Sequence, residues 1–182
     1  MKRVIVTPAI LPPAALAELK EWLGITTAQD DAPLAALLRA ATEMCEDFTQ
    51  VLPLTATCEE TLAPSGEWQA LRTRPVQAIT AVEALATNGV RSPLAAAAHE
   101  VELDAHGGGW IRIRQPLAHA RVVVRFTAGV APDWASLPEA LRHGIVRLAA
   151  HQHRQRDSDG KEPSPPAAVA ALWRPWRRMR LS

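Results

Sequence analysis

The spacing of apolar residues changes twice along this chain, and this constrains the fold more than any other sequence feature. From Leu34 to Phe48 apolar residues recur at three- and four-residue intervals, the period of an amphipathic helix. Across residues 54–127 short segments alternate apolar and polar positions, the period of a half-buried strand. Helical spacing returns from Pro138. The sequence therefore predicts an α+β fold in which N- and C-terminal helices enclose an inserted antiparallel β-rich region of short strands.

Three helices are predicted, and together they would form a small helical bundle. They cover residues 13–23, 31–49 and 138–155. Gly24 follows the first helix, as expected for a residue that ends a helix. Asp31 is the expected N-cap of the second. Ser136 is the expected cap of the third, with Pro138 at its first helical position.

Six short strands are predicted between the second and third helices. They are expected at residues 54–62, 68–72, 79–85, 100–104, 110–114 and 121–127. Pro64-Ser65-Gly66 is typical of a turn, so the first two strands are expected to pair as a hairpin. Asn88-Gly89 and the run Gly107–Gly109 also predict turns. The run 94–98 fits a helical turn and a loose connection equally well.

The two ends of the chain are expected to extend from this core. The residues before the first helix predict a short N-terminal arm. A polar, Pro-rich stretch from Asp157 to Pro166 precedes the C-terminal end. Residues 1–160 are therefore expected to form one domain, and residues 161–182 a linker followed by an extended arm.

The residues that usually carry chemistry form no pattern typical of a catalytic or metal site. The two cysteines, Cys45 and Cys58, are too far apart for a thiolate metal site of Cys-x-x-Cys type. His143, His151 and His153 lack the i, i+4 spacing of a zinc pair on a helix. No apolar stretch approaches the roughly 18–20 residues of a membrane span. We expect no enzymatic activity, no cofactor, no metal and no membrane contact.

Charge is distributed unevenly along a chain whose net charge is only +1. Residues 18–60 contain nine acids and two bases, whereas residues 139–182 contain nine bases and four acids. This asymmetry suits stacking of copies or docking onto a partner of opposite charge.

The C-terminal end contains the densest cluster of Trp and Arg side chains. Its members are Trp173, Arg174, Trp176, Arg177, Arg178 and Arg180. Trp and Arg together are typical of a binding surface, because they supply apolar area and charged hydrogen-bond donors. Two other interpretations remain open: the tryptophans could complete the core, or the segment could be a solvated basic end.

The order of these segments resembles the head-tail connector, or adaptor, proteins of long-tailed phages and phage-derived gene transfer agents. The resemblance rests on Leu19–Ile25 with Asp30–Leu34 and Ala40–Glu43, on Leu71–Val82, and on Phe126–Gly129, Leu137–Leu141, Leu148–His151, Arg156 and Leu172–Arg178. The sequence departs from the family at His151–His153, where an aromatic residue is common. Residues 84–115 match only loosely.

This resemblance implies a structural role in the neck of a particle assembled in the bacterial cytoplasm. Such proteins form a ring, usually of twelve copies, between the portal and the neck (stopper) or tail-completion proteins. Double-stranded DNA passes through the lumen without sequence-specific contacts. The resemblance also implies that the C-terminal arm, with the Trp and Arg side chains named above, reaches the portal.

A second hypothesis is a small regulatory protein that binds nucleic acid through its basic C-terminal region. Such a protein would bind duplex DNA with a steep dependence on salt concentration. The nine acids of residues 18–60 argue against it.

Overall fold

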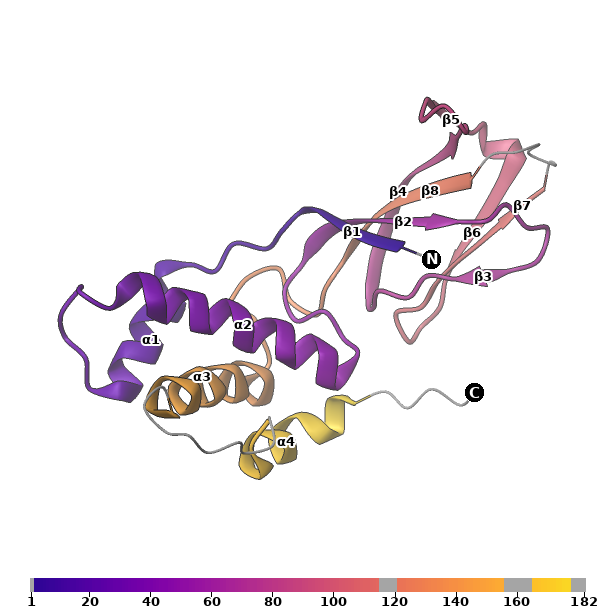
Figure 1. Cartoon of the computed structure of the whole chain (residues 1–182). Helices are drawn as coiled ribbons and strands as arrows, with labels where there is room; N and C mark the ends of the chain where they lie inside the picture. The colour runs from indigo at the N-terminus through magenta and orange to yellow at the C-terminus, as the bar shows by residue number, and fades with distance from the viewer. Residues whose placement is uncertain (1, 115–120, 156–164, 178–182) are drawn as a thin grey trace. The chain divides into compact units, whose positions relative to one another are not determined.

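The structure, a computed structural model, describes residues 2–114, 121–155 and 165–177 (Figure 1). The chain divides into two compact units, each built from segments that are distant in the sequence. A β unit comprises residues 1–9 and 55–130, and a helical unit comprises residues 10–54 and 131–182. The predicted α+β class, with helices from both ends of the chain and an inserted antiparallel region, is confirmed. The boundary expected near residue 160 lies outside the described residues and stays a prediction.

The helical unit contains four α-helices and a short 3-10 turn among its described residues. These are α1 (Pro13–Leu23), α2 (Asp31–Thr49), α3 (Glu139–Arg154), α4 (Ala167–Trp173) and η3 (Arg174–Trp176). The bounds predicted for α1 and α2 are confirmed, and α3 is one residue shorter at each end. Leu19, Leu38, Leu141, Ile145 and Leu148 are at most 1% exposed, so the apolar stripes of α1, α2 and α3 form the core of the unit.

Both predicted side-chain caps are wrong. Asp31 lies inside α2, and its carboxylate instead accepts a hydrogen bond of 2.6 Å from Nζ of Lys20 on α1. The backbone N–H of Ser136 donates to the Asp133 carboxylate, and Pro138 occupies the cap position of α3. Lys20 therefore holds the Asp31 carboxylate, and the Ser136 hydroxyl also hydrogen-bonds to the Asp133 carboxylate in the turn before α3.

The β unit contains eight strands and a 3-10 turn among its described residues. They are β1 (Lys2–Thr7), β2 (Ala56–Leu62), β3 (Gln69–Ala70), β4 (Val76–Leu85), β5 (Arg91–Pro93), η1 (Ala96–Ala98), β6 (His99–Leu103), β7 (Gly109–Ile113) and β8 (Arg121–Ala128). A five-stranded sheet has the order β1-β2-β8-β4-β5, and a three-stranded sheet has the order β3-β7-β6. All the neighbouring strands pair antiparallel.

Pairing in the β unit differs from the sequence prediction at two places. The expected N-terminal arm is β1, which pairs with β2 and places Val4 opposite Glu59. The expected hairpin of β2 with β3 is wrong, because β3 pairs with β7 in the other sheet. Local turn residues could not reveal either pairing, since both depend on strands distant in the sequence. Turns at Gly89 and Gly107, each with positive φ, are confirmed.

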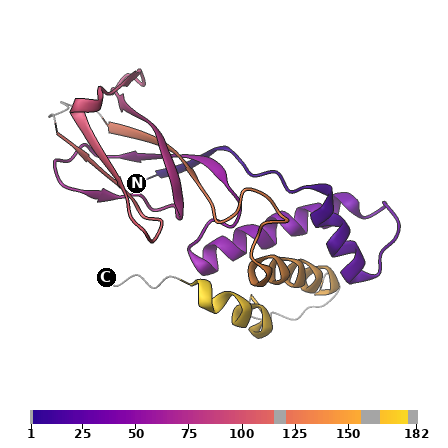
Figure 2. The same ribbon diagram turned by 180° about the vertical axis from the view of Figure 1, so that it is seen from behind.

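The apolar core of the β unit is formed by side chains from both sheets. Val122, Val124 and Phe126 on one face of β8 are at most 1% exposed, and Ile111 and Ile113 of the small sheet are also buried. Figure 2 shows both sheets from the opposite side. Within the described part of the chain, no helix is long and apolar enough to cross a bilayer.

Candidate interaction surface of the C-terminal segment

Trp173, the last residue of α4, lies in the core of the helical unit. Its side chain is fully buried, its ring centroid is 6.0 Å from that of Phe48 on α2, and its Nε1 is 3.5 Å from the Leu141 carbonyl oxygen on α3. The helix presents Val169 and Trp173, one turn apart, to its neighbours, and both are at most 2% exposed. Trp173 therefore completes the core, which was one of the two alternative interpretations of the C-terminal cluster.

The residues after Trp173 are the accessible part of the cluster. Arg174 and Arg177 are exposed, and Trp176 is half-buried. The Arg177 guanidinium lies 5.5 Å from the centroid of the Phe48 ring, a favourable cation–π position. Arg178 and Arg180, the other predicted members, lie outside the described residues. We call Arg174, Trp176 and Arg177 the terminal patch.

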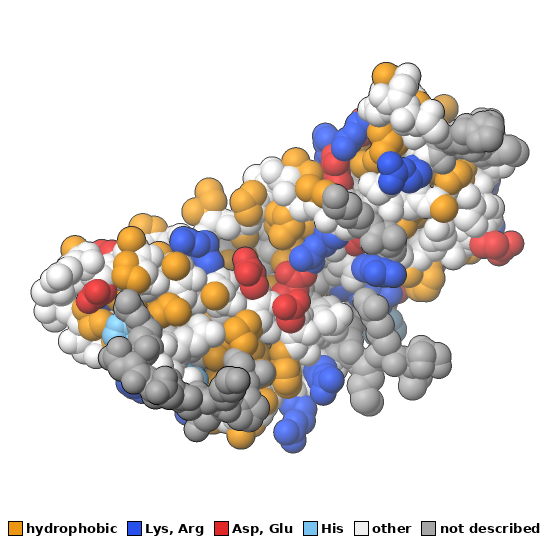
Figure 3. Space-filling model, viewed as in Figure 1, with side chains coloured by type: hydrophobic (Ala, Val, Ile, Leu, Met, Phe, Trp, Pro, Cys, Tyr) orange, Lys and Arg blue, Asp and Glu red, His pale blue; other side chains and the backbone are white. Residues whose placement is uncertain are grey.

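Opposite charges lie on neighbouring elements of the helical unit. Glu43 and Asp47 on α2 are exposed, and Phe48 beside them contacts both Trp173 and Arg177. Figure 3 shows acidic side chains over α2 and basic side chains beside the end of α4. The terminal patch itself combines a partly accessible indole with two accessible guanidinium groups. This composition is suited to binding an acidic surface on a partner protein.

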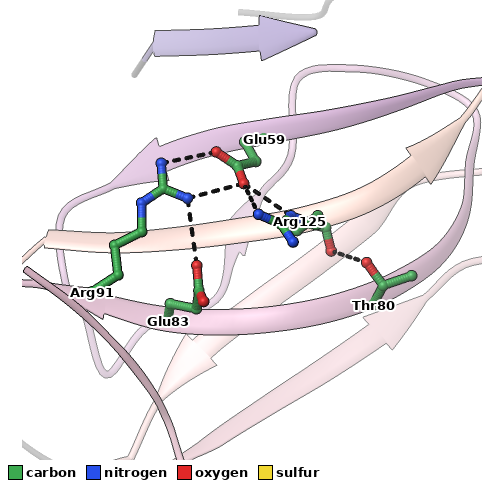
Figure 4. A network of polar contacts seen from close by, with 5 residues as sticks. All are labelled: Glu59, Thr80, Glu83, Arg91 and Arg125. Carbon is green, nitrogen blue, oxygen red and sulfur yellow. Dashed lines mark hydrogen bonds and ion pairs between the residues drawn. The ribbon is translucent and has the colours of Figure 1, made fainter. Parts of the chain in front are cut away.

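A charged network covers one face of the five-stranded sheet in the β unit (Figure 4). Glu59 of β2 accepts two hydrogen bonds of 3.0 Å from Arg91 and bonds of 2.9 and 2.7 Å from Arg125. Glu83 of β4 lies 3.5 Å from the same Arg91. Hydrogen bonds from Arg91, followed by those from Arg125, lower the pKa of Glu59, while the bond to Glu59 raises the pKa of Arg91. All its charges are paired internally, so the network joins β2, β4, β5 and β8.

Glu60 points to the opposite face of β2 and is fully buried. Its carboxylate accepts hydrogen bonds from the backbone N–H groups of Arg72 and Thr73 and from the Thr73 hydroxyl, at 2.8 to 3.1 Å. These bonds hold the segment between β3 and β4. The sequence places Glu59 and Glu60 at neighbouring positions of one strand, and such positions face opposite sides of a sheet. It gave no signal for their partners, which lie on other strands and loops.

The described residues contain no group of three or more His, Cys, Asp or Glu side chains arranged to hold a metal ion. His143, on α3, packs edge-on to Trp22 of α1, with ring centroids 5.1 Å apart. Cys45 and Cys58 are buried, and burial raises the pKa of the Cys45 thiol to about 12. These side chains therefore serve packing in the described structure.

No protein-family model matches the sequence. No curated protein matches it either. Solved structures do match it, over nearly the whole of both chains. A chain from the neck of an empty gene transfer agent (GTA) particle, computed with C6 symmetry, is 28% identical, with a TM-score of 0.81 over 100% of this chain and 98% of that one.

Two further matches come from native particles. A chain in the virion of a native gene transfer agent particle is 28% identical, with a TM-score of 0.77 over 100% of this chain and 98% of that one. A chain from the neck of a native particle, computed with C12 symmetry, is also 28% identical, with a TM-score of 0.74 over 98% and 97% of the two chains. The likeness includes both the β unit and the helical unit, so this chain has the fold of neck chains of gene transfer agent particles, which supports its placement with the head-tail neck adaptor proteins of phages and gene transfer agents.

Proposed function

We propose that this protein is a structural adaptor that forms a closed ring in the neck of a phage or phage-like particle. The observation that carries this proposal is the full-length likeness to neck chains of gene transfer agent particles. We propose twelve copies in the ring. Double-stranded DNA would pass through the lumen and contact it without sequence preference. The role is assembly rather than catalysis, and it needs no cofactor.

The proposed partners are the portal on one side of the ring and the neck (stopper) or tail-completion protein on the other. We assign portal binding to the terminal patch together with Arg178 and Arg180. Trp176 supplies apolar area, and the guanidinium groups supply paired hydrogen-bond donors for carboxylates of the partner. Trp173 is not part of this binding surface, because its side chain is buried within its own unit.

Truncation after Trp173 separates docking from folding. Removing residues 174–182 leaves the buried indole in place, so the shortened protein is expected to keep most of its melting temperature. It is expected to lose binding to purified portal and, in producing cells, to leave DNA-filled heads without tails. Size-exclusion chromatography, a thermal melt, a portal pull-down and electron microscopy of particles measure these outcomes.

A charge reversal in the full-length chain provides the matched comparison. Arg174→Glu with Arg177→Glu is expected to weaken portal binding at least tenfold, whereas Arg39→Glu, at an exposed position of α2, is expected to leave it unchanged. A folded truncation that still binds portal and supports tailed particles would refute the docking assignment. Absence of the protein from purified necks would refute the adaptor function itself. Steep, salt-dependent binding to free duplex DNA would instead support the regulatory hypothesis.

A further inference from the structure

α2 has an acidic face on the side that points away from the core of the helical unit. Leu38 and Cys45 of this helix are buried, whereas Glu43 and Asp47 are exposed. Because successive residues of a helix are about 100° apart, Asp47 lies about 180° round the helix from Leu38, and Glu43 about 140°. No ion pair in the described part of the chain uses either carboxylate. We call these two acids the outer face of α2.

α3 has a basic face that points away from α2. Arg147 is half-buried and Arg154 is exposed. They lie about 140° and 160° round the helix from Gln152. Gln152 marks the side that meets α2, since its Nε2 is 3.2 Å from Sδ of Met44. Among the described residues neither guanidinium belongs to an ion pair, and we call these two arginines the outer face of α3.

The two outer faces lie on opposite sides of the packed pair of helices α2 and α3. Each points away from the contact that joins the two helices, so the acids and the arginines do not meet within one chain. Two acidic faces would repel each other, and so would two basic faces, whereas an acidic face and a basic face attract. The chain itself supplies both, and this favours a second copy of the same chain as the partner of each face.

The directions of α2 and α3 determine how such a contact would align. Met44 of α2 lies beside Gln152, near the end of α3. Phe48, one turn later in α2, packs on the ring of Trp173. That ring contacts Leu141, near the start of α3, so the two helices run in opposite directions. Successive copies in a ring of twelve are rotated by one twelfth of a turn, about 30°, so α2 of one copy also runs nearly antiparallel to α3 of the next.

We infer that the outer face of α2 in one copy packs antiparallel against the outer face of α3 in the next copy. With Asp47 opposite Arg147, Glu43 lies one turn further along α3, within reach of Arg154. Four charged side chains that have no ion-pair partner in one chain thereby form two ion pairs between copies. Arg39, another turn earlier in α2, falls beyond Arg154 and opposes neither arginine.

This contact is heterologous, because each copy offers its acidic face to one neighbour and its basic face to the other. Repetition of a heterologous contact gives a ring when the rotation between copies closes. The inference rests on the proposed ring, and it specifies which surfaces join the subunits. It leaves the terminal patch, which follows α4, available for the portal.

Complementary charge reversals test the pairing in producing cells. Glu43→Arg with Asp47→Arg makes both outer faces basic, and Arg147→Glu with Arg154→Glu makes both acidic. Each double variant as the sole copy is expected to reduce the amount of the chain in purified necks at least about tenfold, because like charges then meet at every contact. Co-expression of the two is expected to restore most of the native amount, since basic and acidic copies can alternate round a ring with an even number of copies.

The outcomes separate this inference from the proposed function. Glu67→Arg with Glu102→Arg, at exposed positions of the β unit, is the matched control and is expected to enter necks normally. Either double variant present in necks at the native amount overturns the pairing and leaves the adaptor role intact. Loss of both folded variants without recovery on co-expression also overturns it, because the two faces then bind separate partners. Absence of the native chain from necks overturns the adaptor role and the pairing with it.

A crosslink that keeps every charge decides the register if a reversed variant fails to fold. Arg147→Lys preserves the positive charge and supplies an amine, which a carbodiimide joins to an adjacent carboxylate. In treated necks we expect ladders of linked chains on a denaturing gel, with an amide between position 147 and Asp47 or Glu43 identified by mass spectrometry. Adding Glu43→Gln and Asp47→Asn is expected to remove this link. Necks that contain the chain but give no such link between copies contradict the inferred contact.

Discussion

The indole of Trp173 lies directly on Gly144, where a Cβ at position 144 would overlap the Nε1, Cε2 and Cδ1 atoms of the ring. The absence of a side chain on Gly144 allows α4 to approach α3 closely enough to bury this tryptophan completely. The contact explains why a short helix that follows a polar, Pro-rich stretch packs against the helical unit.

Replacing the two C-terminal tryptophans separately is expected to give different effects on stability. Trp173→Ala empties a fully buried site and is expected to lower the free energy of unfolding by about 3–5 kcal/mol. Trp176→Ala removes a half-buried side chain and is expected to cost less than about 1 kcal/mol. Urea titrations of the two variants measure both values. Equal losses would contradict the division between a core residue and the terminal patch.

A larger residue at position 144 is expected to displace Trp173. Gly144→Val overfills a packed contact and is expected to cost about 1–3 kcal/mol, with a change in tryptophan fluorescence. The same substitution in the Trp173→Ala background is expected to be neutral or stabilising, because the indole is no longer there. A double-mutant cycle measures this coupling. Additive losses would show that the two positions do not share one space.

Glu59 is expected to stabilise the β unit in a pH-dependent way. Its pKa in the folded protein is lowered from the model-peptide value of 4.5, chiefly by hydrogen bonds from Arg91. Its contribution is therefore present above about pH 4.5 and is lost as the pH falls through the lower, folded-state pKa. Glu59→Gln is expected to cost about 1 kcal/mol at neutral pH, because water screens the partly exposed guanidinium groups.

Chemical denaturation at pH 7 and at pH 3 checks the Glu59 prediction. The difference between the native protein and Glu59→Gln is expected to shrink at the lower pH. Glu67→Gln, at an exposed position of the same unit, is expected to have little effect at either pH. A difference that grows as the pH falls would reverse the sign that the Arg91 and Arg125 contacts require.

Glu60 is expected to matter more for stability than Glu59. Glu60→Ala removes the acceptor for the N–H and hydroxyl of Thr73, which is buried, and for the N–H of Arg72. Each buried donor left unpaired costs about 1–3 kcal/mol, so the two donors of buried Thr73 predict a total loss of about 2–6 kcal/mol. Glu60→Gln keeps one acceptor oxygen and is expected to cost less. Thermal melts of both variants, with Glu67→Ala as the control, measure this order.

Local sequence features correctly predicted the helices and turns that depend only on residues close together in the sequence. The bounds of α1 and α2 followed from apolar periodicity with Gly24 at one end, and the turns at Gly89 and Gly107 followed from the need for positive φ. The caps at Asp31 and Ser136 were predicted wrongly. Their groups bind Lys20 and Asp133 in the folded chain, and the local pattern of a cap does not exclude such competing partners.

The sequence by itself determined the α+β class, the helical periodicity and the resemblance to neck adaptor proteins, because these are recorded in spacing and order along the chain. Only the tertiary structure decided that β3 pairs with β7, that Glu60 binds the segment after β3, and that Trp173 belongs to the core rather than to a free arm. Each of these depends on which distant segments come together. That choice is made by the burial of apolar area and the pairing of buried polar groups across the whole chain, and no local pattern contains it.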